Sequence, residues 1–377
     1  GSALTKRELA RTWHQKLDAA TGLVVKQAKL VPVRISYSIG SRRYEKQPDA
    51  SDLALIAKID ATPSPHWMPI SELPDGFNTR QPKESHGVTR LHHFYTSRCA
   101  GLLSNYRSKC STSDDLFLLT RVAAQVTLRY RFTYQSGTWG AGGGPMSGTL
   151  YIPSLIKELN PLEQLKQASS DQKKRIGQSL KFTPSITSTA SSTQLGIVPD
   201  ECLDYIFIDP PFGSNIMYSD LNLLWEGWLR VFTNNRHEAI ENSVQKKSLD
   251  DYRQLMNRCF SEAFRVLKPG RWMTVEFSNT QASVWNAIQT ALQEAGFVVA
   301  NVSALDKQKA SFKATTTTTA VKQDLVISAY KPNGGLEDRF SISGGNEDSV
   351  WDFVRTHLKY LPTVKVKDNE LEFIAER

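Results

Sequence analysis

The chain has 377 residues, 40% apolar and 22% charged, which suits one large or two ordinary globular domains and excludes a disordered chain. Its net charge of +8 and isoelectric point of about 9.2 favour a polyanionic partner such as nucleic acid, although many basic soluble proteins share this balance. No apolar run reaches the roughly 20 residues of a membrane helix, and the four scattered cysteines indicate neither a zinc ribbon nor a disulfide framework. We therefore expect a cytoplasmic protein.

The first half of the chain reads as helices separated by turns. A strand is expected over residues 28–37, before a turn at Gly40. Residues 62–88 are rich in proline, glycine and charge, which indicates an extended surface segment, and residues 134–148 form a glycine-rich loop. Hydrophobic periodicity predicts helices over 3–20, 49–60, 96–107, 113–130 and 162–180.

From residue 200 onward, strand-like and helix-like runs alternate as in a doubly wound α/β sheet. The predicted strands cover 203–209, 272–277, 297–305 and 324–330, of which the last two could form an antiparallel edge pair. The predicted helices cover 221–231, 250–267, 283–295 and 350–358. Lys268-Pro269-Gly270 and Gly296 are expected to end two of these helices. The fold class is thus α/β, with an additional helical and loop-rich N-terminal region.

The tetrapeptide Asp209-Pro210-Pro211-Phe212 ends the strand over 203–209, where open α/β sheets collect their ligands. The two prolines fix φ and lead the backbone away from the sheet on a rigid path. The Asp209 carboxylate and the Pro210 carbonyl are then two acceptors for the two N–H groups of an aromatic amine. Accepting both hydrogens draws the nitrogen toward tetrahedral geometry and frees its lone pair for a methyl group. Phe212 would stack on the base, a contact worth roughly 1 to 3 kcal/mol.

The same four residues also suit a simple turn at the end of a strand, where Asp and Pro are common. Their setting favours the functional interpretation. A hydrophobic strand precedes them, a Gly213-Ser214-Asn215 turn and a helix follow, and the next predicted strand lies farther along.

The tetrapeptide matches the D/N/S-P-P-Y/F/W motif of amino-methyltransferases. The longer run over residues 204–221 resembles bacterial DNA methylases found with restriction and defence loci, and the likeness extends to 92–98, 147–154 and 275–277. The resemblance implies a Rossmann-like class I methyltransferase sheet, S-adenosyl-L-methionine as cofactor, and double-stranded DNA with a flipped base as substrate. It also implies restriction or defence subunits as partners. Asp in the first motif position implies the N6 amine of adenine. The N4 amine of cytosine is the alternative, and a non-catalytic DNA-binding fragment is a second one.

Such enzymes hold the cofactor with a Phe-x-Gly-x-Gly loop, which this sequence lacks, so we expect a fragment whose missing segment lies upstream. The cluster over residues 142–144 is the remaining glycine-rich candidate, without a clear strand before it. Phe94, Tyr95 and Thr96 resemble a motif near the methionine carboxylate, although aromatic residues here could equally be core. The resemblance further assigns cofactor contacts to Thr187 and Ser191, at the end of a neighbouring strand, and to Asp209.

DNA contacts are expected in the basic segment after the catalytic loop, which could equally be a solvated loop. The candidate residues are Asn234, Asn235, Arg236, Lys246 and Lys247. His92-His93 lacks a second ligand pair at metal spacing, so no metal site is predicted. The expected organisation is an accessory or recognition region over 1–90, a methyltransferase core over 91–335 and an extension over 336–377.

Overall fold

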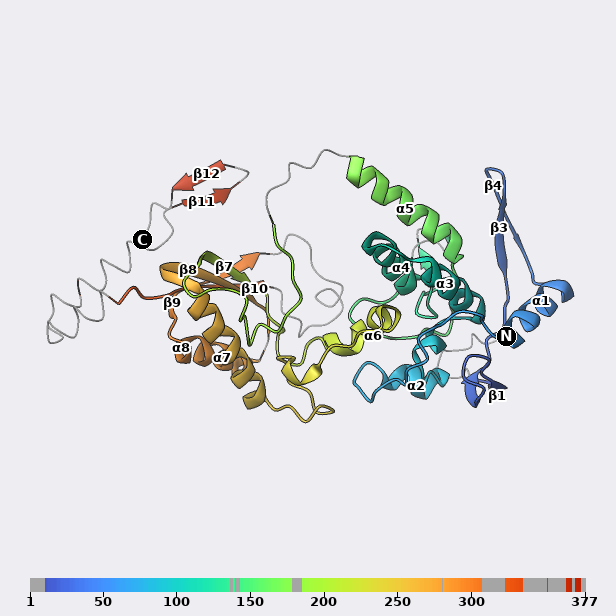
Figure 1. Cartoon of the computed structure of the whole chain (residues 1–377), viewed down its shortest axis with the longest axis horizontal. Helices are drawn as coiled ribbons and strands as arrows, with labels where there is room; N and C mark the ends of the chain where they lie inside the picture. The colour runs from blue at the N-terminus through green and yellow to red at the C-terminus, as the bar shows by residue number, and fades with distance from the viewer. Residues whose placement is uncertain are drawn as a thin grey trace. The chain divides into compact units, whose positions relative to one another are not determined.

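The computed structural model describes residues 11–135, 138–139, 143–177, 185–279, 281–306, 323–334, 351, 364–367 and 370–373. The chain divides into two compact units, shown with their elements in Figure 1. Unit 1 consists of Gly1–Pro184 and Met217–Asn234, and unit 2 of Ser185–Ile216 and Asn235–Arg377. The domain boundaries expected at residues 90 and 335 follow a different division and stay a prediction.

Unit 1 combines short hairpins with a group of helices. Its strands are β1 (Trp13–Leu17), β2 (Val24–Ala28), β3 (Ile35–Ile39), β4 (Arg42–Lys46), β5 (Tyr134–Gln135) and β6 (Thr138–Trp139). Its helices are α1 (Ala50–Ala61), α2 (Arg80–His86), the 3-10 helix η1 (Leu91–Phe94), α3 (Ser97–Lys109), α4 (Ser113–Gln125), α5 (Pro161–Gly177) and α6 (Tyr218–Leu229). The helices predicted over 49–60 and 96–107 are confirmed. The helix predicted over 113–130 is present but ends at Gln125, and the helix predicted over 162–180 is present through Gly177, after which 178–180 lie outside the described residues.

The core of unit 1 lies between η1, α3, α4 and α6. Helix α4 begins with a capping box. The Asp115 amide donates to the Thr112 hydroxyl oxygen, and the Thr112 amide donates to the Asp115 carboxylate. One face of this helix then buries Leu119 and Val122, which pack in one cluster with Phe94 of η1 and Trp228 of α6. Residues far apart in the sequence thus share one apolar interior.

The start of the chain differs from the prediction. Residues 13–17, expected to lie in a helix over 3–20, form strand β1, which pairs antiparallel with β2 from Trp13↔Ala28 to Leu17↔Val24. Residues 1–10 lie outside the described residues. The predicted turn at Gly40 is confirmed, because Gly40 takes a φ of 60° between β3 and β4. The predicted surface segment over 62–88 contains helix α2 and buried residues such as Leu73 and Val88.

Unit 2 is built on a four-stranded sheet with the order β7-β8-β10-β9. Strands β7 and β8 are parallel, whereas β10 is antiparallel to both β8 and β9. The strands are β7 (Leu203–Ile208), β8 (Leu267–Phe277), β9 (Val298–Asp306) and β10 (Gln323–Tyr330), and a separate hairpin pairs β11 (Val364–Lys367) with β12 (Glu370–Phe373). The helices are η2 (Asn235–His237), α7 (Leu249–Val266) and α8 (Ala282–Glu294).

Helices α7 and α8 cover one face of this sheet, as Figure 1 shows. Alternate residues of β8, among them Met273, Val275 and Phe277, point to this face and pack with Phe260 of α7 and Ile288 of α8. Tyr205 and Phe207 of β7 alternate with core-packed Ile206 and Ile208 and are exposed. The sheet therefore has one well-packed face that fixes the ends of β7 and β8.

The α/β class expected from the sequence is confirmed by this mixed sheet with its helices. Strand β8 begins at Leu267, so the Lys268-Pro269-Gly270 stop lies inside a strand, and Gly296 follows α8 with a φ of 95°. The predicted antiparallel pair of last strands is present. Of these two strands, β9 lies at an edge of the sheet and β10 lies inside it. The predicted helix over 350–358 lies almost wholly outside the described residues. Within the described residues, none of the helices combines the length and apolar character needed to cross a bilayer.

Candidate functional site

The tetrapeptide begins immediately after the carboxyl end of β7. Because β7 and β8 are parallel, with Ile208 opposite Val275, the residues that follow both strands meet at one edge of the sheet. Asn279, two residues beyond β8, donates from its side-chain amide to the Phe212 carbonyl at 3.0 Å. The sequence prediction that Asp209 ends a strand at the ligand-binding edge is consistent with this placement.

Three consecutive carbonyls after Pro210 are fixed by three different elements. The Tyr252 hydroxyl on α7 donates to the Pro211 carbonyl at 2.7 Å, and Asn279 holds the Phe212 carbonyl. The Glu241 amide donates to the Gly213 carbonyl at 3.2 Å. Tyr252 is fully buried, and burial raises the pKa of its phenol, so the hydroxyl stays a donor at neutral pH. Two carbonyls of the tetrapeptide and that of the following Gly213 are thereby held in place.

Gly213 allows the chain to turn away after Phe212. Its φ of 68° lies in the left-handed region, which residues with a Cβ adopt only with strain. A Cβ at this position would also come within 3.2 Å of Val284 Cγ1 on α8. The close approach of α8 therefore requires glycine here.

The side chains of the tetrapeptide divide between the core and the surface. Pro210 is buried, and Phe212 is half-buried with its ring edge-to-face against Phe277 at 5.3 Å between centroids. Asp209 is exposed. Within the described part of the chain, neither the Asp209 carboxylate nor the Pro210 carbonyl makes a hydrogen bond, in contrast to the next three carbonyls. The two predicted acceptors are thus without a hydrogen bond among the described residues, next to a backbone that is fixed.

The predicted DNA-binding segment forms a compact loop that is attached to the tetrapeptide through Glu241 and Gly213. Asn242 and Lys247 exchange two backbone hydrogen bonds, at 3.0 and 2.9 Å, which close the turn between them. The Lys247 ammonium donates to the carbonyls of Asn235 and Glu238 at 2.5 and 2.6 Å, and burial lowers its pKa. Lys247 therefore braces the loop, whereas Lys246, Asn234, Asn235 and Arg236 are exposed.

Phe94, Tyr95 and Thr96 lie in the interior of unit 1. Phe94 is fully buried, and the buried Tyr95 hydroxyl accepts a hydrogen bond from the Trp228 indole at 3.0 Å. Thr96 caps α3 by accepting from the Cys99 amide and also donates to Glu158 at 3.1 Å. These contacts give all three residues structural roles, and their cofactor role stays a prediction.

The other predicted cofactor residues are placed in irregular segments. Thr187 and Ser191 are exposed, and residues 185–202 form no strand, so the neighbouring strand that they were expected to end is not found in the described chain. Gly143 and Gly144 have φ angles of 98° and 124° and lie beside Arg131, whose guanidinium donates to the Gly144 carbonyl at 3.0 Å. This turn is not a strand–loop–helix cradle, and Gly142 lies outside the described residues.

Sequence reasoning missed Tyr252, Asn279 and Glu241, which hold the site in place. Asn279 could have been found, because it follows a predicted strand at the edge where ligands collect. Tyr252 and Glu241 have no such local signal.

A cavity of about 230 Å³ in unit 1 is lined by Trp67, Ser104, Arg107, Ser108, Cys110 and Arg230, and none of the predicted site residues is among these six.

Comparisons with known proteins agree with the motif. A family model described as DNA methylase, whose name joins N6 and N4 methyl transfer, matches residues 203–370, somewhat less than half of the chain. The matched segment begins at β7 and includes the tetrapeptide. It also includes the three residues that donate to the carbonyls of residues 211–213. Residues 203–370 are thus similar to a DNA methylase in sequence. No curated protein matches the chain.

Solved structures show weaker likenesses. A provisionally assigned DNA modification methylase from Thermus thermophilus, complexed with S-adenosyl-L-methionine, is 14% identical over 38% of this chain and 54% of that chain, with a TM-score of 0.25. The antibiotic-resistance methyltransferase Kmr is 12% identical over 39% and 61%, with a TM-score of 0.22. The chain spans about half the length of the Thermus methylase. At these TM-scores the likenesses carry no argument about fold or activity.

Proposed function

We propose that this protein is an S-adenosylmethionine-dependent DNA methyltransferase that methylates the N6 amine of a flipped adenine, with Asp209 and Pro210 as the base-side acceptors. The carrying observation is the contrast within one loop: three carbonyls accept hydrogen bonds, whereas the Asp209 carboxylate and the Pro210 carbonyl accept none from the described residues. The DNA methylase match over residues 203–370 supports the same assignment.

The two acceptors act on the amine through hydrogen bonding. A flipped adenine offers two N–H hydrogens on N6, one to the Asp209 carboxylate and one to the Pro210 carbonyl. The nitrogen then turns pyramidal, so that its lone pair forms the new N–C bond. One amine proton leaves through the exposed Asp209 carboxylate to solvent. Most of the rate comes from holding amine and methyl in line at near-attack distance.

The cofactor would supply an electrophilic methyl group, whose bond to sulfur breaks as the N–C bond forms and leaves S-adenosylhomocysteine. Among the described residues, the glycines at 143–144 do not form the strand–loop–helix cradle that would suit its methionine part. The roles above are therefore those of the base side alone. Cofactor contacts by Phe94, Tyr95, Thr96, Thr187 and Ser191 remain part of the proposal.

The decisive experiment replaces Asp209 in the full-length protein. Asp209→Asn keeps the size of the side chain but weakens the acceptor, and we expect methyl transfer from radiolabelled S-adenosylmethionine to duplex DNA to fall roughly a thousandfold, about 4 kcal/mol. The matched control is Asp204→Asn on the same strand, because Asp204 is exposed and pairs with Lys268 at 3.0 Å. Undiminished transfer by Asp209→Asn would refute the proposal.

The methylated base is identified by digesting the product DNA and separating its nucleosides by mass. N6-methyladenine is the expected product, whereas N4-methylcytosine would keep the role of Asp209 and correct the base. The rival is a DNA-binding fragment without catalysis. Calorimetric titration with S-adenosylmethionine separates the two: micromolar binding supports the enzyme, and absence of binding together with retained DNA affinity favours the fragment.

A further inference from the structure

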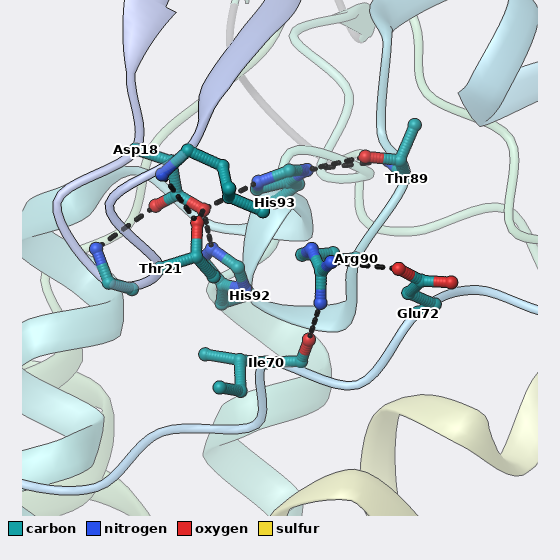
Figure 2. A network of polar contacts seen from close by, with 10 residues as sticks. Asp18, Thr21, Ile70, Glu72, Thr89, Arg90, His92 and His93 are labelled. Carbon is teal, nitrogen blue, oxygen red and sulfur yellow. Dashed lines mark hydrogen bonds and ion pairs between the residues drawn. The ribbon is translucent and has the colours of Figure 1, made fainter.

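Three buried ligand-type side chains meet in unit 1, where Asp18 joins a pair of adjacent histidines 74 and 75 residues farther along the chain. Asp18 follows β1, and His92 and His93 lie on η1 (Figure 2). The His92 Nε2 atom lies 2.9 Å and the His93 Nε2 atom 3.4 Å from the same Asp18 oxygen, Oδ2. The three side chains retain 8%, 7% and 4% of their exposure, respectively. A carboxylate and two imidazoles therefore point at one spot away from solvent.

Asp18 is held in place by its own hairpin. Its carboxylate accepts from the Thr21 hydroxyl at 2.6 Å and from the Ala20 amide at 3.1 Å, besides its contacts with the two histidines. The carboxylate therefore has a fixed position between the hairpin and η1.

The neighbouring Arg90 has partners other than Asp18. Arg90, the closest in sequence to the histidines, donates to Glu72 and to the Ile70 carbonyl, both at 2.8 Å (Figure 2). Within the described chain, neither lysine nor arginine forms an ion pair with Asp18. The His92 Nδ1 atom is, moreover, a buried nitrogen without a hydrogen-bond partner among the described residues. Buried uncompensated charge is costly, and a bound cation would offset that cost.

The geometry suits a divalent metal. Ligand atoms about 2.0 to 2.1 Å from a tetrahedral zinc ion lie about 3.3 Å from each other. The two nitrogen–oxygen distances of 2.9 and 3.4 Å bracket that value, and all three candidate ligand atoms lie within 4.8 Å of one another. His93 Nδ1 accepts a hydrogen bond from the Thr89 backbone amide at 3.3 Å and lies 3.4 Å from the Thr89 hydroxyl, so residue 89 fixes the orientation of this ring.

We propose that Asp18, His92 and His93 bind one divalent metal ion of the zinc class, with a remaining position for water. Two imidazole nitrogens and one carboxylate oxygen are a three-ligand set that zinc uses in proteins. The ion joins the β1–β2 hairpin to η1, and it stabilises the folded state because its ligands are assembled only there. This site goes beyond the proposed methyl transfer, and its test does not depend on that activity.

The test is metal binding by the full-length protein after removal of metal with a chelator. Calorimetry with Zn²⁺ is expected to show one site of micromolar or tighter affinity, and Zn²⁺ is expected to raise the thermal unfolding midpoint by several degrees. Co²⁺ as a substitute is expected to show visible d–d absorption. His93→Gln and Asp18→Asn are expected to weaken Zn²⁺ binding at least a hundredfold. The exposed His66→Gln is the matched control and should bind as the wild type does.

A measurement on the wild type alone tests the proposal even where a variant fails to fold. X-ray absorption of the zinc-bound protein is expected to show nitrogen and oxygen neighbours with two imidazole rings, and no sulfur from the four free cysteines. A sulfur shell, absence of Zn²⁺ binding, or wild-type affinity in folded His93→Gln would each overturn the proposal. Asp18 would then serve only as a hydrogen-bond acceptor between the hairpin and η1.

Discussion

Asp209 and Asp18 show two opposite ways of using a carboxylate. Asp209 is exposed and makes no hydrogen bond in the described chain, but the backbone after it is fixed through Tyr252, Asn279 and Glu241. Asp18 is buried, and four donors converge on its two oxygens: the Ala20 amide, the Thr21 hydroxyl and the two histidines. The difference teaches that Asp209 is left unbonded on a rigid backbone, whereas Asp18 is saturated with hydrogen-bond partners in the metal-free protein.

The largest effect on stability is expected from replacing the saturated carboxylate. Asp18→Ala strands several buried donors, and we expect it to lower the free energy of unfolding of the metal-free protein by about 3 kcal/mol. Asp209→Ala should change it by less than about 0.5 kcal/mol, as for an exposed side chain. Urea unfolding followed by circular dichroism measures both. Equal costs would break the comparison.

A second buried group in unit 1 predicts a dependence of stability on pH. Burial, aided by Arg11 and opposed by the Pro153 carbonyl, lowers the pKa of His86 to about 4 from 6.5. Between these values the unfolded chain binds more protons, so the free energy of unfolding falls as the pH drops from 6.5 to about 4, then levels off. The shift corresponds to about 3 kcal/mol. His86→Gln should flatten the fall by that amount, and the exposed His66→Gln should not; identical slopes in all three proteins would contradict this.

The frame around the open carboxylate is tested by Tyr252→Phe. This change removes only the hydroxyl that holds the Pro211 carbonyl. We expect kcat for methyl transfer to fall tenfold to a hundredfold with little change in KM for DNA, because the acceptors lose their alignment. Tyr205→Phe is the control, since its hydroxyl bonds Thr274 on the uncovered face of the same sheet. A change in KM alone would assign Tyr252 to binding.

The smallest effect is expected at the two lysines of the loop after the tetrapeptide. If Lys246 contacts a phosphate, Lys246→Met reduces the slope of log affinity against log salt by about 0.9, with only a few-fold loss of DNA affinity. Lys247→Met should leave that slope unchanged, because its ammonium is bound to two carbonyls of the loop. Fluorescence anisotropy at several salt concentrations distinguishes them. Equal slopes for the two variants would place both lysines in the same role.

The sequence predicted best where the local pattern and the tertiary environment agree. Helix α7 has a Ser248–Asp251 capping box and one apolar face, and β7 is a hydrophobic run before two prolines, so both were found within about two residues. Residues 13–17 were wrongly predicted as helix because their short charged and apolar pattern fits either period. These residues form a strand because they pair with β2, and no local signal in the sequence reveals that pairing.

The two candidate sites also differ in how far local sequence could predict them. The position of Asp209 at a strand end followed from residues within one short segment. The Asp18–His92 contact joins residues 74 apart, so the histidine pair gave no sign of a third ligand, and the expectation of no metal site rested on spacing alone. Tyr252 is likewise 41 residues from the carbonyl that it holds. Contacts between residues so far apart along the chain arise from the tertiary fold, and the spacing of residues in the sequence does not predict them.

The open pair at Asp209 and Pro210 has a consequence for the choice of base. Both atoms are oxygens with lone pairs, and the fixed backbone beside them cannot rotate to present an N–H in their place. Adenine and cytosine carry an amino group at the position where guanine and thymine carry a keto oxygen. A keto oxygen would face two lone pairs without a hydrogen between them, a repulsive arrangement. Under the proposed base-side role, Asp209 and Pro210 would reject guanine and thymine, and the size of the ring would separate adenine from cytosine.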